Sequence, residues 1–165
     1  MKMENILSYL TNCIWLLIPI MLWNMVFIEK LPVVYATENF WKDIPSFIAG
    51  GENFFRLLIF ALPVLMPLRI STATQKLGMG LYVLGVLVYF GSWLLQMYFP
   101  LSGWSMSAAG FLAPAYTPLI WLVGIGLIGR ELYFPTPYEE WVYISISVMF
   151  VIFHVSHAWT VYSRI

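Results

Sequence analysis

A single charged residue, Arg56, lies inside an otherwise apolar stretch, and Glu52 precedes it by four residues. In a helix this spacing brings the carboxylate beside the guanidinium, so the sequence predicts an ion pair. Charged groups inside a membrane are costly and usually face the interior of a helical bundle, where they mark binding or transport sites. A guanidinium held there can bind a carboxylate or a phosphate through two parallel hydrogen bonds.

Two histidines, His154 and His157, lie three residues apart in the last apolar stretch and therefore share one face of a helix. They could form hydrogen bonds between helices. With Glu52 they could also supply two nitrogens and a carboxylate to a metal ion, for which zinc or copper is the candidate. Arg56 opposes this metal site because its cation competes for Glu52. We expect no haem, because both histidines lie on one helix and the chain has no third.

Polar residues on several stretches are predicted to lie at one depth in the membrane. Counting 1.5 Å per residue from the inner boundary of each stretch places Arg56, Tyr89 and His154 all about 20 Å from that boundary. Polar stripes of this kind turn toward the bundle interior, because lipid cannot satisfy their hydrogen bonds. The predicted ligand-binding set is Glu52, Arg56, Tyr89, Trp93, Gln96, His154 and His157.

The stretches that position these residues indicate an all-α membrane protein. Hydrophobic residues make up 61 % of the 165 residues and charged residues only 10 %, whereas soluble domains are roughly 25 % charged. A helix needs about 20 apolar residues to cross a bilayer core of about 30 Å. We predict one polytopic bundle over residues 1–165, with five transmembrane helices at about 6–28, 50–69, 77–99, 108–129 and 137–163. The net charge of zero gives no basis for nucleic-acid binding.

Three local patterns predict details of this bundle. The run Thr136–Glu139 has the spacing of a capping box with proline at the first helical position, so we expect the last helix to begin at Pro137. Apolar residues at helical spacing over Phe40–Ile48 predict a short interfacial helix on the outer side, which Gly50–Gly51 would end. Two prolines and four glycines predict that the fourth helix is bent.

The distribution of basic residues predicts the orientation of the chain. Cytoplasmic loops carry an excess of lysine and arginine. Placing the N-terminus in the cytoplasm puts Lys2, Arg69, Lys76 and Arg130 on that side, against Lys30, Lys42 and Arg164 on the other. We therefore expect an integral protein of a bacterial inner membrane, with its N-terminus cytoplasmic and its C-terminus outside.

The polar residues at one depth favour a pocket in the outer-leaflet half of the bundle. We predict that this pocket binds or transports a small anionic or amphipathic ligand, a membrane lipid included. Two alternatives stay open. One is a small membrane enzyme acting on a lipid or its head group, with or without a metal, in which a histidine serves as general base. The other is a structural or assembly subunit, in a homo-oligomer or a larger membrane complex. Whether the chain is an enzyme is left open.

Overall fold

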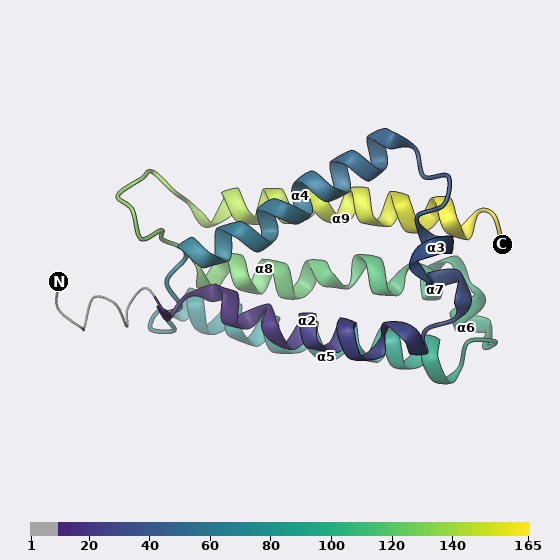
Figure 1. Cartoon of the computed structure of the whole chain (residues 1–165). Coiled ribbons are helices and arrows are strands. Elements are labelled where there is room, and N and C mark those ends of the chain that lie inside the picture. The colour runs from purple at the N-terminus through teal and green to yellow at the C-terminus, as the bar shows by residue number, and fades with distance from the viewer. Residues whose placement is uncertain (1–9) are drawn as a thin grey trace.

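A computed structural model describes residues 10–165, and this part of the chain is helical with no β-strand (Figure 1). The long helices lie roughly along one direction, and α4 is inclined across α9 (Figure 1). Their bounds are α2 Ile18–Phe27, α4 Ser46–Leu65, α5 Ala73–Tyr98, α7 Ala108–Tyr116, α8 Pro118–Ile128 and α9 Glu140–Tyr162. Shorter elements are η1 Cys13–Leu16, η2 Ile28–Lys30, η3 Val33–Tyr35, α3 Thr37–Phe40 and α6 Gly103–Met106.

Five helical segments within residues 10–165 are long and apolar enough to cross a membrane. They are Cys13–Lys30, Ser46–Leu65, Ala73–Tyr98, Ala108–Ile128 and Glu140–Tyr162. The predicted all-α class and the five spans are therefore confirmed, and the chain has the character of an integral membrane protein. The predicted beginning of the first span, residues 6–9, lies outside the described residues.

Helices α5 and α8 pack backbone against backbone through glycines. A Cβ atom added at Gly85 would lie 2.4 Å from the backbone nitrogen of Trp121, and one added at Gly124 would lie 2.6 Å from that of Tyr82. Lipid gives no hydrophobic drive for helix association, so close van der Waals packing of this kind holds membrane helices together. This contact fixes the rotation of α5, which carries Tyr89 and Trp93 into the bundle.

The start of α5 is tied to the end of α8 by Gln75. Its backbone N–H donates to Thr72 Oγ1 (3.2 Å), and its side-chain Oε1 accepts from the Thr72 N–H (3.1 Å), which together form a capping box. The Nε2 atom of the same side chain donates to the carbonyl of Ile128 (3.2 Å). One residue thus satisfies free backbone groups at the ends of two helices.

The fourth span, for which we predicted a bend, is interrupted at Thr117. Helix α7 ends at Tyr116, and α8 begins at Pro118, whose ring is compatible with a first helical position. The hydroxyl of Thr117 donates to the carbonyl of Ala113 (2.7 Å) at this break. The same carbonyl also accepts from the Thr117 N–H (3.1 Å), so the helical hydrogen bond just before Pro118 is kept.

The predicted start of the last helix is wrong. Helix α9 begins at Glu140, and the N-cap residue Glu139 makes no side-chain capping bond. The N–H of Tyr138 bonds instead to the carbonyl of Thr136 (2.8 Å), and the Tyr138 hydroxyl lies 3.9 Å from the sulfur of Met66. Packing of Tyr138 on the bundle thus holds this segment out of the helix, despite its capping pattern.

The predicted interfacial helix over Phe40–Ile48 is also wrong. Helix α3 ends at Phe40, a turn follows with Asp43 at φ 51°, and α4 begins at Ser46. Proline disfavours a helical residue before it and lacks an N–H, so Pro45 lies at the N-cap of α4 instead of within a helix. Gly50–Gly51 does not end a helix but lies inside α4, where Gly51 lets the ring of Phe153 approach its backbone.

Candidate functional site

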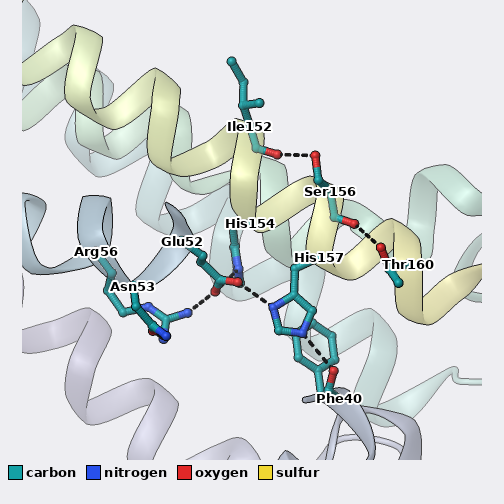
Figure 2. A network of polar contacts seen from close by, with 9 residues as sticks. All are labelled: Phe40, Glu52, Asn53, Arg56, Ile152, His154, Ser156, His157 and Thr160. Carbon is teal, nitrogen blue, oxygen red and sulfur yellow. Dashed lines mark hydrogen bonds and ion pairs between the residues drawn. The ribbon is translucent and has the colours of Figure 1, made fainter. Parts of the chain in front are cut away.

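Glu52 is a fully buried carboxylate at the contact between α4 and α9 (Figure 2). One oxygen accepts from the Arg56 guanidinium and lies 2.9 Å from Nδ1 of His154. The other lies 2.5 Å from Nδ1 of His157. Two predictions are confirmed here: α4 begins before Glu52, and Arg56 is bonded to it. Four of the predicted site residues thus form one cluster, named here the Glu52 cluster: Glu52, Arg56, His154 and His157.

His157 reports where the protons of the Glu52 cluster lie. Its Nε2 atom is 2.8 Å from the backbone carbonyl of Phe40, which can only accept, so Nε2 carries a hydrogen (Figure 2). Its Nδ1 atom faces Glu52 Oε2, and two lone pairs would repel at that distance. One proton must therefore lie between these two atoms, either on the imidazole or on the carboxyl group.

This proton gives the Glu52 cluster a net positive charge. The Glu52–His157 pair is neutral overall, because it is either a carboxylate with an imidazolium or a carboxylic acid with an imidazole. Arg56 adds one positive charge, and His154 adds none when neutral and one when protonated. The sum is at least +1. Arg56, whose side chain is 35 % exposed, presents this positive charge to its surroundings, so an anion beside the Glu52 cluster would pair with it.

A cavity of about 330 Å³ lies beside the Glu52 cluster and is lined from all five spans. Among the predicted residues, Arg56, Tyr89, Trp93 and His154 line its wall, whereas Glu52 and His157 do not. No acidic side chain within residues 10–165 lines it. The cavity thus meets the cationic cluster through Arg56 and His154, and the remainder of its wall is mainly apolar.

Gln96 lies away from this cavity, although we predicted it as a ligand-binding residue. Its side chain is buried and donates to the backbone carbonyls of Gly110 (2.8 Å) and Ser105 (3.4 Å). These bonds tie the end of α5 to α6 and the start of α7. Tyr89, by contrast, lines the cavity and donates through its hydroxyl to Oδ1 of Asn24 on α2 (2.7 Å).

Arg56 keeps hydrogen-bond capacity for a ligand. A guanidinium has five N–H donors, and its two acceptors within residues 10–165 are Glu52 Oε1 and Asn53 Oδ1 (3.3 Å). Three N–H groups therefore remain, on a side chain that is 35 % exposed. Nε2 of His154 likewise has no hydrogen-bond partner in the described part of the chain.

Two aromatic rings that the predicted site did not include lie next to Arg56. The guanidinium carbon is 5.5 Å from the centre of the Trp41 ring and 6.0 Å from that of Phe150. Phe150 lies four residues before His154 and stacks on its ring (5.3 Å between centroids), so helical spacing is a signal that could have found it. The contact of Trp41 has no such signal, because it depends on the turn between α3 and α4.

The connection over residues 31–41 forms part of the cavity wall. It contributes Leu31, Tyr35 and Trp41 to the wall, and the Tyr35 hydroxyl donates to the carbonyl of Phe111 on α7 (2.9 Å). Burial raises the pKa of Tyr35, so its hydroxyl stays protonated as this donor requires. The connection is therefore held at two points, by Tyr35 on α7 and by the bond between His157 and the Phe40 carbonyl.

The arrangement of His154, His157 and Glu52 favours hydrogen bonding over metal ligation. Zinc ligands lie about 2.0–2.2 Å from the metal, whereas both Nδ1 atoms contact the carboxylate oxygens directly. In the described part of the chain, no group of three or more histidine, cysteine, aspartate or glutamate side chains is placed to hold a metal ion.

What the site offers chemically is a fixed cation, Arg56, at the edge of a mainly apolar cavity. Such a site suits a molecule with one anionic end and an apolar body.

Comparisons of the chain with protein-family models, with curated proteins and with solved structures found no match.

Proposed function

We propose that this membrane protein binds a small amphipathic anion in the cavity beside the Glu52 cluster, with the anionic group on Arg56 and His154. The observation that carries the proposal is the net positive charge of the Glu52 cluster, next to a mainly apolar wall to which the described residues contribute no acidic side chain. An anion would neutralise this charge and accept from the remaining N–H groups of Arg56. Transport of the anion would require the same binding step.

Removing the guanidinium tests this function. We expect Arg56→Gln to weaken binding of an anionic probe by about tenfold or more, because a charge-assisted pair of hydrogen bonds is lost. Arg56→Lys should retain only part of the affinity, because a lysine cannot bind a carboxylate bidentately. The measurement is a scintillation proximity assay on the purified chain in nanodiscs, with radiolabelled naphthoate and undecanoate as probes and neutral naphthamide as the uncharged comparison.

Arg69→Gln is the matched control, because it removes the same charge from a side chain that is 65 % exposed and lies 3.6 Å from Glu131. Its affinity for both anions should equal that of the unchanged chain. Ala115→Leu leaves Arg56 intact but fills part of the cavity that Ala115 lines, so it should weaken binding without loss of folding. If neither anion binds saturably, or if Arg56→Gln binds as well as Arg69→Gln, the proposal is wrong, and the structural-subunit alternative gains support.

We further propose that the C-terminus and the 31–41 connection lie on the outer side of a bacterial inner membrane, as the basic residues predict. Cys13 is fully buried, so cysteines introduced at Lys2 and at the exposed Ile165 can be labelled selectively. A membrane-impermeant maleimide should modify Ile165→Cys in intact cells and Lys2→Cys only after permeabilisation. The reverse pattern would contradict this orientation and leave the helix assignment unchanged.

A further inference from the structure

The wall of the cavity is unusually rich in aromatic rings. Nine of the twenty-one described residues that line it are Phe, Tyr or Trp, whereas these residues make up 18 % of the chain. Lipid-facing packing calls for apolar side chains of any kind, so it does not explain this enrichment. The rings come from α4, α5, α7, α8, α9 and the 31–41 connection, so an occupant would meet rings on several sides.

The rings on the α5 side are not stacked flat on one another. Tyr89 meets Trp93 at an interplanar angle of 66° and Trp121 at 63°, with centroids 5.9 and 6.4 Å apart. These are edge-to-face contacts, in which the rings do not lie flat on each other. A planar ligand ring can therefore find stacking partners here without separating an existing stack.

Two aromatic rings of the cavity wall lie next to the Arg56 guanidinium. The Trp41 and Phe150 rings both lie within 6.0 Å of the Arg56 guanidinium carbon, and Phe150 also stacks on His154. A carboxylate bound to Arg56 would therefore lie directly next to these two rings. An anionic group attached directly to a ring fits this spacing better than one at the end of a long chain.

The volume of the cavity also favours a compact, rigid occupant. At about 330 Å³ it lies at the lower end of the range of small-molecule sites, and it is too small to enclose both acyl chains of a phospholipid. A flexible aliphatic chain must lose conformational freedom to fit, whereas a fused ring system loses almost none.

From these observations we infer that the cavity selects a planar aromatic monoanion, such as an aromatic carboxylate, over an aliphatic anion of equal size. This inference rests on the proposed function, since it specifies the ligand of the same site. The aromatic body stacks among the rings of the wall, and the carboxylate accepts from Arg56. Ring faces, and not apolar area alone, set the preference.

The test compares naphthoate with undecanoate, which have the same number of carbon atoms and the same charge, on the full chain in nanodiscs. We expect naphthoate to bind about tenfold more tightly. Phe60→Leu removes one ring of the wall and should weaken naphthoate binding about threefold or more, with little change for undecanoate. Phe54→Leu is the matched control, because Phe54 lies on the same helix, is exposed and does not line the cavity.

Each outcome decides a separate point. Equal affinities, or tighter binding of undecanoate, would overturn the aromatic preference and leave anion binding at Arg56 standing. A preference for naphthoate that Phe60→Leu does not reduce would also overturn the inference, since the selectivity would then arise outside this wall. If neither anion binds saturably, the proposed function fails first. Loss of the preference in Phe60→Leu but not in Phe54→Leu would support the inference.

Discussion

Replacement of Glu52 by leucine is expected to lower the free energy of unfolding by about 3–5 kcal/mol, because it removes a buried ion-pair partner and leaves buried polar atoms without a hydrogen bond. The Glu52 carboxylate is fully buried and bonds to Arg56, His154 and His157. A leucine side chain would fill similar space but accept no hydrogen bond. The positive charge of Arg56 would then lack its counter-ion, and the Nδ1 atoms of His154 and His157 would lose their hydrogen-bond partner.

The measurement is unfolding by sodium dodecyl sulfate in mixed micelles, followed by tryptophan fluorescence. Glu131→Leu serves as the control, because that side chain is 71 % exposed and pairs with Arg69 at 3.6 Å; its change should stay within about 1 kcal/mol. Glu52→Gln, which keeps one acceptor oxygen, should lie between the two. Equal stability of Glu52→Leu and the unchanged chain would show that the Glu52 cluster does not hold α4 against α9.

A single methyl group at Gly85 is expected to cost about 1–3 kcal/mol and to disturb the cavity as well. The Cβ of an alanine there would lie 2.4 Å from the Trp121 backbone nitrogen. Because this clash is with backbone, only movement of α5 away from α8 can remove it. Trp121 lines the cavity, and so does Tyr89 on the opposing helix. Gly85→Ala should therefore weaken naphthoate binding together with stability.

Gly91→Ala is the control for this change. Gly91 lies on the same helix, and a Cβ there would meet nothing within 4 Å. Alanine should then be neutral or stabilise α5 by up to about 1 kcal/mol, through its higher helix propensity. The same detergent titration and the naphthoate assay compare the two variants. If Gly85→Ala matched Gly91→Ala in both assays, the close approach of α5 and α8 would be refuted.

Much of the bundle and part of the site follow from the sequence, because their causes are local. Apolar runs of about 20 residues predict the spans, since the thickness of the bilayer and the rise of a helix are both fixed. The same rise predicts that Arg56 and His154 lie at one depth, and the four-residue spacing predicts that Arg56 pairs with Glu52. The structure confirms that pair and brings both histidines to it.

Other features depend on the rotation of each helix and on backbone groups, which local patterns do not determine. The capping pattern before Glu140 gives way to the packing of Tyr138 on Met66. Gln96 lies seven residues after Tyr89 and therefore on the same face of α5, yet it bonds to the start of α7 and lies outside the cavity.

The bond between His157 and the Phe40 carbonyl joins residues 117 positions apart. Any residue type at position 40 would present that carbonyl, so the sequence carries no signal of the contact that sets the charge of the Glu52 cluster. The sequence by itself determined the five apolar helices and the ion pair. Only the tertiary structure decided which of these groups face the cavity, because that depends on the close packing of α4 on α9 and of α5 on α8.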